Sequence, residues 1–340
     1  MKGGATGRVA AVLGAGSWGT TLAMLLQGLD WHVRLWDGDG PNLERIRAEG
    51  ENRKYLPGIA LPETLEVVLD LPSALEDAAL VTWAVPSVAL REVARAAKPV
   101  LPAKAIEACA TKGLEPVHDG RLPRRMSEVL HEELGDRPRA LLVGPSHAEE
   151  VSRGVPTSVV AAALRLEWAE QVQQAFFSPR FRVYTQDDLV GVEMGSALKN
   201  VIALAAGVGD GLGYGDNTKG ALLTRGLAEM SRLGTALGAR RDTFFGLSGM
   251  GDLITTAISR HSRNRRVGER LGRREAMGTV LEDLGQVAEG VTTAPAARAL
   301  AEAHGIEAPI TREVCALLYE GKSPQEALFD LLAREAKREA

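Results

Sequence analysis

Short apolar runs and amphipathic stretches alternate along the first half of the chain. The run Val9–Leu13 predicts a buried strand, residues 20–29 predict a helix after a glycine-rich stretch, and His32–Trp36 predicts a second strand that ends at Asp37. Strands that alternate with helices predict a doubly wound, mostly parallel sheet, in which ligands bind beyond the carboxyl ends of the strands. The same pattern predicts further strands at 65–69, 80–85, 105–109, 140–143, 158–162 and 182–184, and helices at 43–49, 88–97, 124–134 and 166–176.

The pattern changes after about Asp188. β-Branched runs become rare, while Ala, Leu, Gly, Glu and Arg dominate with helical spacing. We therefore expect an α/β domain over residues 1–189 and an all-α domain over residues 190–340. The predicted helices of the second half are 190–208, 222–237, 265–271, 294–304 and 311–319.

Composition narrows the functional class. The 340 residues carry 40 Lys and Arg against 44 Asp and Glu, a net charge of −4, which argues against bulk nucleic-acid binding. Two cysteines and scattered histidines argue against a disulfide framework and against a metal site. No apolar stretch approaches the length of a membrane span, and the short glycine-rich start lacks the core of a signal peptide. We expect a cytoplasmic protein.

A glycine-rich turn follows the first predicted strand and opens a helix. Gly14, Gly16 and Gly19 have the G-x-G-x-x-G spacing, in which the glycines allow a tight turn, close approach of a pyrophosphate and close helix packing. We expect Ser17 and Trp18, inside the turn, to contact a dinucleotide as well, although packing explains Trp18 equally well.

Asp37 ends the second predicted strand, 18 residues after Gly19. A carboxylate there accepts hydrogen bonds from ribose hydroxyls and repels a 2′-phosphate, which favours NAD over NADP. The alternative is a solvated acid at a strand end.

One lysine of the second half lies in a strongly apolar stretch. Lys199 is flanked by Leu198, Val201 and Ile202. A buried lysine has a lowered pKa and serves as a general acid or base near neutral pH. Taken alone, a lysine that extends its ammonium to solvent is the more common case.

Two further segments of the second half carry polar chemistry. Asp252 follows a glycine turn, where capping of a helix is sufficient to explain it. Residues 259–266 include four arginines, and each guanidinium group can donate two parallel hydrogen bonds to phosphate oxygens. Most basic runs, however, lie on a solvent-exposed helix face, and Arg265 or Arg266 fits that description.

Two loops at predicted strand ends complete the candidates. Lys112 follows the strand at 105–109, and Gly144, Ser146, His147 and Ala148 follow the strand at 140–143. Packing or capping explains His147, and the helix dipole explains the acids Glu149 and Glu150 that follow.

Together these segments resemble the NAD(P)-dependent glycerol-3-phosphate dehydrogenases. The matching stretches are spread over nearly the whole chain in family order, and the pair GSALKN and SRNRR is the most specific. They are GAGSWGT at 14–20, TKG at 111–113, GPSHAE at 144–149, GSALKN at 195–200, GDLITT at 251–256, SRNRR at 262–266 and GQVAEG at 285–290.

The resemblance implies a Rossmann domain, a helical domain, an active site between them, and reversible reduction of dihydroxyacetone phosphate to sn-glycerol 3-phosphate for phospholipid synthesis. It implies a homodimer, NAD or NADP as cofactor, and no metal. Asp37 departs from many bacterial members and favours NAD. The resemblance implies that Lys199 is the catalytic lysine, with Lys112 and Asp252 beside it. It implies that the substrate is bound by Gly144, Ser146, Asn200, Thr256, Ser262, Arg263 and Asn264. It implies that the cofactor is contacted by Lys112, Ala148, Arg263, Val287 and Glu289.

In this hypothesis Lys199 stabilises the charge that develops on the carbonyl oxygen and donates the proton. Arg263 and Asn264 clamp the phosphate, which supplies positioning energy. One alternative is a related dehydrogenase for a 3-hydroxyacyl thioester or a sugar acid, which has no need of a phosphate segment. Another is a non-catalytic protein that binds nucleotides or nucleic acid through residues 260–266.

Overall fold

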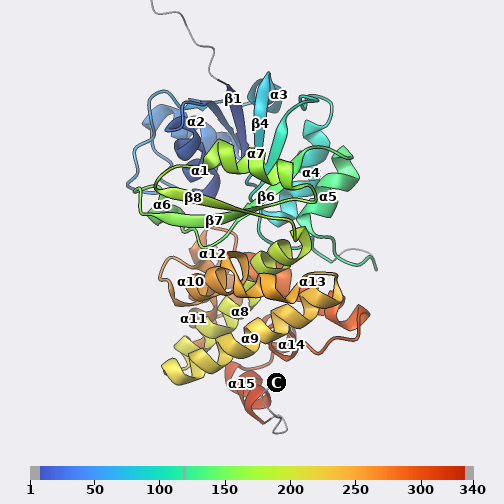
Figure 1. Ribbon diagram of the computed structural model, residues 1–340. Helices are drawn as coiled ribbons and strands as arrows, with labels where there is room; N and C mark the ends of the chain where they lie inside the picture. Colours follow the sequence, from blue (N-terminus) through green and yellow to red (C-terminus); the bar gives the residue numbers. More distant parts are fainter. Residues whose placement is uncertain (1–7, 118–119, 334–340) are drawn as a thin grey trace, which may run out of the picture. The chain divides into compact units, whose positions relative to one another are not determined.

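The computed structural model describes residues 8–117 and 120–333 and divides the chain into two units (Figure 1). The first unit comprises the chain up to Lys112 together with Arg124–Glu193, and the second comprises Gly113–Pro123 together with the chain from Met194. Residues 113–123, expected in the first domain, therefore belong to the second unit. A single boundary in the sequence cannot describe this division, because the chain returns to the first unit at Arg124. The expectation about a signal peptide concerns residues 1–7, which lie outside the described residues.

The first unit is built on one sheet with the order β3-β2-β1-β4-β5-β6-β7-β8. β7 runs antiparallel to β6, and every other neighbouring pair is parallel. The predicted fold class, a mostly parallel sheet followed by a helical region, is confirmed. The strands are β1 Val9–Leu13, β2 His32–Trp36, β3 Glu66–Val67, β4 Ala78–Trp83, β5 Ile106–Cys109, β6 Arg139–Val143, β7 Thr157–Ala162 and β8 Phe181–Gln186.

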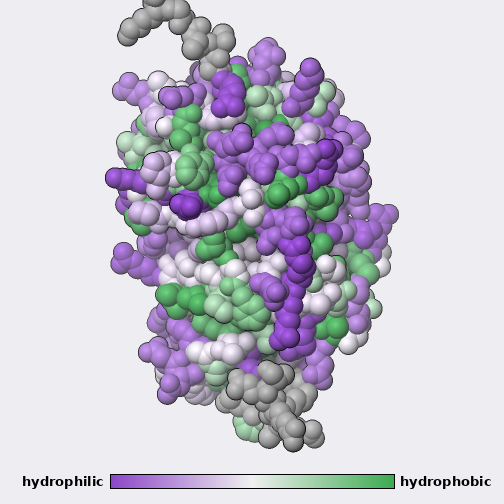
Figure 2. All heavy atoms as spheres, in the orientation of Figure 1, coloured by the Kyte–Doolittle hydropathy of each residue, from purple (hydrophilic) through white to green (hydrophobic). Residues whose placement is uncertain are grey.

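Helices cover the sheet because the strands are apolar on both faces. Ala10 and Val12 of β1 share a core with residues of α1, α2 and α7, and the alternate residues Ala11 and Leu13 are buried as well. The outer side of α7 is polar, and Figure 2 shows mostly hydrophilic atoms over it. The helices are α1 Ser17–Gln27, α2 Gly40–Glu49, α3 Leu71–Leu75, α4 Ser87–Ala97, α5 Met126–Leu134, α6 Ala148–Val151 and α7 Leu166–Phe176.

The second unit is helical and is organised around α8, Leu189–Gly211, whose first residues belong to the first unit. This helix is long and apolar enough to cross a membrane, but 83% of its most apolar window is buried in the structure, as in a core helix. The remaining elements are α9 Asp216–Ala236, a 3₁₀ turn Arg241–Phe245, a π-helical turn Leu247–Gly251, α10 Asp252–Ile258, α11 Arg263–Gly272, α12 Met277–Leu284, α13 Glu289–Ala303, α14 Pro309–Tyr319 and α15 Pro324–Leu332.

Glycines bring α8 and α11 into direct backbone contact. A Cβ on Gly207 of α8 would lie 2.0 Å from the carbonyl oxygen of Arg265, and a Cβ on Gly268 of α11 would lie 2.0 Å from that of Leu204. Gly211 and Gly272, one turn further along each helix, are equally restricted. Two facing G-x-x-x-G pairs therefore set the distance between these helices.

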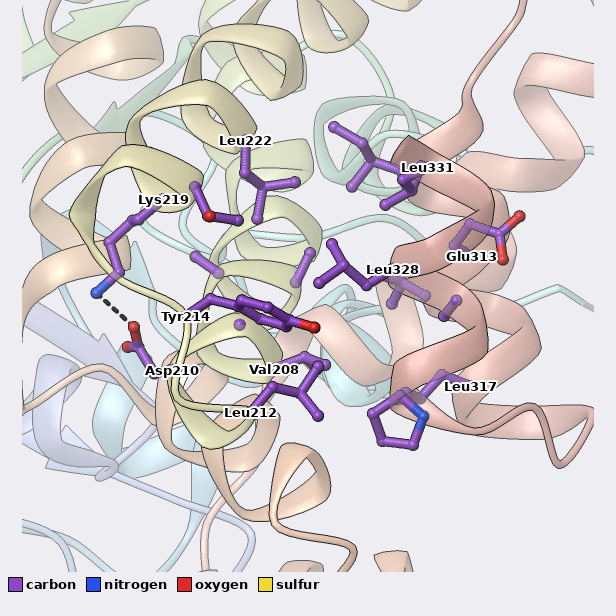
Figure 3. Close-up of a pocket in the computed structure, with 18 residues that line it drawn as sticks. Val208, Asp210, Leu212, Tyr214, Lys219, Leu222, Glu313, Leu317, Leu328 and Leu331 are labelled. Carbon is purple, nitrogen blue, oxygen red and sulfur yellow. Dashed lines mark ion pairs between the residues drawn. The ribbon is translucent and has the colours of Figure 1, made fainter. Parts of the chain in front are cut away.

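The C-terminal helix α15 faces apolar side chains of the other helices across a pocket. Figure 3 shows Tyr214 and Leu222 facing Leu328 and Leu331 of α15 across a pocket whose rim carries the ion pair of Lys219 with Asp210, at 2.7 Å. None of the predicted site residues lines this pocket. We therefore assign it to packing of α15 against α8, α9 and α14.

Candidate functional site

The glycine-rich turn joins β1 to α1. Gly14 has φ +117°, and a Cβ there would lie 2.6 Å from the backbone of Ala84. A Cβ on Gly19 would lie 1.8 Å from the carbonyl oxygen of Gly14, whereas Gly16 has nothing within 4 Å of that position. Gly14 and Gly19 are therefore required by packing, while Gly16 leaves the backbone accessible.

Helix α1 begins directly at this open position. Gly16 is its N-cap, no side chain caps the helix, and its first turn contains no acid. A helix start of this kind carries partial positive charge and suits phosphate. Ser17 is buried, and the ring of Trp18 lies 6.4 Å from that of Phe181, so Trp18 has a packing role in this unit.

Asp37 is tied to the same turn. Its Oδ2 accepts a hydrogen bond from the Ala15 N–H at 2.5 Å, and its Oδ1 accepts one from the Asp39 N–H at 2.8 Å. The reading of Asp37 as a merely solvated acid is therefore wrong, because the carboxylate braces the turn.

Lys112, Gly144 and Ser146 come together at the carboxyl ends of the neighbouring strands β5 and β6. The Lys112 ammonium donates to the carbonyl oxygen of Gly144 at 2.7 Å, and the Ser146 hydroxyl donates to the same oxygen at 3.0 Å. Gly144 has φ +148°, and a Cβ there would lie 2.9 Å from Val159. Ala148 starts α6, and its carbonyl oxygen lies 3.4 Å from the hydroxyl of Thr21 on α1.

His147 is the N-cap of α6, although its side chain makes no capping hydrogen bond, and Glu149 and Glu150 lie in the first turn of that helix. The positions of Glu149 and Glu150 match the helix-dipole explanation stated for them, whereas capping by the His147 side chain does not occur.

Lys199 of α8 is buried in the second unit. Its ammonium donates to Asp252 Oδ1 at 2.8 Å and to Thr256 Oγ1 at 2.7 Å. The three residues are 2–5% exposed. A buried ammonium requires partners of this kind, so the alternative of a lysine reaching solvent is wrong.

The expectation that Asp252 serves as a helix N-cap is also wrong. Asp252 is the first residue of α10, follows a π-helical turn, and Gly251 occupies the cap position. Its carboxylate faces Lys199 and Thr256 instead. The π-helical turn, which sequence periodicity does not reveal, places the carboxylate there.

Asn200, the residue after Lys199, meets the arginine-rich segment. Asn264 Nδ2 donates to Asn200 Oδ1 at 2.8 Å, and Asn264 Oδ1 accepts from the Gly290 N–H at 2.8 Å. The amide of Asn264 thereby joins α8, α11 and the start of α13. Gly290 has no room for a Cβ, which would lie 2.6 Å from the Asn200 carbonyl oxygen.

The segment 262–266 separates into different environments. The buried Ser262 caps α11 by accepting from the Arg265 N–H at 3.2 Å. Arg263, the first residue of the helix, is half-buried, and Arg266 is exposed. Arg265 is not simply solvated, because it pairs with Asp210 at 2.7 Å. Val287 and Glu289 lie half-buried at the start of α13, beside Gly290.

Two features of the site were not predicted from sequence. Asn52 is fully buried and contacts the glycine-rich turn, and no motif singles it out. The facing pairs Gly207/Gly211 and Gly268/Gly272 have detectable G-x-x-x-G spacings, although the second glycine of each pair lies beyond the end of the predicted helix.

The buried thiols lie outside this chemistry. Burial raises the pKa of Cys109 to about 12 and that of Cys315 to about 11, so both remain protonated near neutral pH.

Both halves of the chain match models of known protein families. Residues 9–169 match the family described as NAD-dependent glycerol-3-phosphate dehydrogenase N-terminus, and residues 188–329 match its C-terminus. The chain belongs to this family. The resemblance that GSALKN and SRNRR suggested is thereby confirmed.

Relatives match over nearly the full length. The glycerol-3-phosphate dehydrogenase (NAD(P)+) of Moorella thermoacetica is 51% identical over 97% of both chains, and that of Geobacillus thermodenitrificans is 48% identical over 96% of this chain and 95% of its own. The crystal structure of glycerol-3-phosphate dehydrogenase from Coxiella burnetii has a TM-score of 0.92 at 40% identity and covers 96% of this chain and 99% of that one.

Proposed function

We propose that this chain catalyses the reversible NAD(P)-dependent reduction of dihydroxyacetone phosphate to sn-glycerol 3-phosphate. The observation that carries the proposal is the buried Lys199–Asp252–Thr256 cluster, adjacent in sequence to an Asn200–Asn264 junction with the arginine-rich segment. A buried ammonium is suited to a carbonyl oxygen that gains charge, and an arginine-bearing helix start is suited to a phosphate.

The first unit fits a dinucleotide. The open position at Gly16 and the uncapped start of α1 would hold the pyrophosphate, with Ser17, Trp18 and Ala148 nearby. Asp37 keeps a negative charge fixed at the end of β2, where the adenosine ribose of a Rossmann domain lies, which favours NAD over NADP. When bound, the nicotinamide supplies the hydride for reduction and takes it back for oxidation.

Lys199 is the proposed general acid. Its ammonium stabilises the developing oxyanion and donates the proton, and in the reverse direction the neutral amine accepts it. Asp252 and Thr256 hold the ammonium in place by accepting two of its hydrogen bonds. Lys112, fixed by Gly144 at the sheet edge, supplies a second positive charge.

The remaining predicted residues bind and orient the substrate and cofactor. Arg263 and the helix start capped by Ser262 hold the phosphate, and Asn264 orients this segment against Asn200. We assign Gly144 and Ser146 to the substrate loop. Val287 and Glu289 are assigned to the cofactor, which Arg263 also contacts.

The deciding experiment follows the absorbance of NADH and, separately, NADPH with dihydroxyacetone phosphate. We expect oxidation of both reduced cofactors, faster with NADH, and little reaction with unphosphorylated dihydroxyacetone. Equal rates with both ketones would instead favour the dehydrogenase for a non-phosphorylated substrate. Salt-sensitive nucleic-acid binding without NADH oxidation would support the non-catalytic alternative.

We further propose that the enzyme is a cytoplasmic homodimer that supplies glycerophospholipid synthesis. The 36.2 kDa chain should then sediment at twice its own mass. A monomer at micromolar concentration would contradict the dimer without touching the proposed reaction.

A further inference from the structure

The Ala15 peptide groups of the glycine-rich turn are held from two sides by side chains distant in sequence. The Ala15 N–H donates to Asp37 at 2.5 Å, and the Ala15 carbonyl oxygen accepts from Asn52 Nδ2 at 2.7 Å. Ala15 and Asn52 are both fully buried. Two consecutive peptide planes, one on each side of Ala15, are thereby fixed.

Asn52 is itself held in one orientation. Its Nδ2 also donates to the hydroxyl of Thr20 on α1 at 2.8 Å, so two acceptors determine which way the amide points. Its backbone oxygen accepts from the Leu56 N–H at 2.7 Å, and Leu56 is 1% exposed. The amide therefore comes from an anchored loop rather than from a mobile one.

The peptide that Asn52 holds also carries the N–H of Gly16. In a trans peptide the C=O and N–H point in opposite directions, and the described residues contain no cis peptide bond. A hydrogen bond to the Ala15 oxygen thus directs the Gly16 N–H away from Asn52. Gly16 is the N-cap of α1 and has open space around it.

We propose that Asn52 is a positioning residue for the dinucleotide, which orients the Gly16 N–H toward the pyrophosphate while Asp37 holds the preceding peptide. This inference rests on the proposed function. A donor fixed before binding costs no reorganisation when the ligand arrives, so its loss weakens binding more than it slows the chemical step.

The test is Asn52→Ala, with NADH binding measured by titration calorimetry and turnover measured in parallel. We expect the Kd for NADH to rise about tenfold, the effect of about one hydrogen bond. Both kcat at saturating NADH and KM for dihydroxyacetone phosphate should stay within about twofold, because Asn52 acts on the turn alone. Asn42→Ala is the matched control, since Asn42 is a buried asparagine of the same unit, 2% exposed, with no hydrogen bond to the turn.

An unchanged Kd for NADH in a folded Asn52→Ala protein would overturn the proposal, and so would an equal rise in Asn42→Ala. If Asn52→Ala does not fold, Thr20→Val removes the second acceptor of the Asn52 amide and should raise the Kd about threefold; no rise there would overturn it as well. Failure of the wild-type protein to bind NADH would instead contradict the proposed function.

Discussion

The ammonium of Lys199 on α8 and the carboxylate of Asp252 on α10 lie 2.8 Å apart, although the two residues are 53 positions apart in sequence, and both side chains are at least 94% buried. Burying two charges is costly unless they are paired and hydrogen-bonded, and Thr256 supplies the additional hydrogen bond. The arrangement keeps a positive charge inside the helical unit, where electrostatic interactions are stronger than in water.

Replacement of Lys199 by Met should abolish most turnover. We expect kcat to fall by about 10²- to 10⁴-fold, the usual contribution of a positioned general acid, while the Kd for NADH changes little. Steady-state kinetics and NADH titration measure the two quantities. Lys98→Met, at an exposed position after α4, is the control and should retain full activity. Near-normal turnover of a folded Lys199→Met protein would remove this residue from the mechanism.

Replacement of Arg263 by Ala should act on the phosphorylated substrate. With NADH saturating, so that the proposed cofactor contact of Arg263 does not limit the rate, we expect KM for dihydroxyacetone phosphate to rise about 10- to 100-fold, because a hydrogen bond to a charged group is lost. The slow reaction of dihydroxyacetone should then change very little. Arg266→Ala, at the exposed position of the same helix, is the control. An equal loss with both ketones would contradict the phosphate assignment.

Replacement of Gly268 by Ala should destabilise the helical unit. The added Cβ would lie 2.0 Å from the Leu204 carbonyl oxygen, so α8 and α11 must move apart, at a cost of about 1–3 kcal/mol or more. Urea unfolding measures the change. Gly220→Ala, in an exposed part of α9 with nothing within 4 Å, should instead stabilise the protein by about 0.5–1 kcal/mol. Similar effects of the two substitutions would show that helix contact is not the cause.

The ionisation of Glu229 should make the free energy of unfolding depend on pH. Burial raises the pKa of Glu229 above its ordinary value of 4.5, although its carboxylate accepts hydrogen bonds from Ile310 and Thr311 at the start of α14. The folded chain therefore holds this proton at pH values where the unfolded chain has lost it. The contribution of Glu229 to the free energy of unfolding consequently falls as the pH rises from 4.5 through the raised pKa.

Urea unfolding of the wild type and of Glu229→Gln between pH 4.5 and 8 isolates this contribution. The stability advantage of the wild type over the variant should shrink as the pH rises through that window. Glu326→Gln is the control: hydrogen bonds from Ser323 lower the pKa of Glu326, so no such decline is expected above pH 4.5. A wild-type advantage that grows with pH would contradict the assignment.

Sequence alone was sufficient for the elements with strong local signals. The apolar run at Val9–Leu13, the three glycines after it and the apolar stretch around Lys199 identified a strand, a strand-to-helix turn and an apolar helix, because burial periodicity and glycine chemistry are local properties. The short helix α3 was missed, because five residues carry too little periodicity.

The tertiary structure decided which residues interact when they are far apart in the sequence. The pattern around Lys199 left burial and solvent exposure both open, and only the folding of a π-helical turn against α8 provided the carboxylate of Asp252. Likewise the acid at the end of β2 is expected from sequence to face a ribose, but only the fold shows that Asp37, together with Asn52, also holds Ala15. These hydrogen bonds join groups 22 to 53 residues apart, and they depend on how the elements pack. Packing is a property of the whole chain rather than of any window within it.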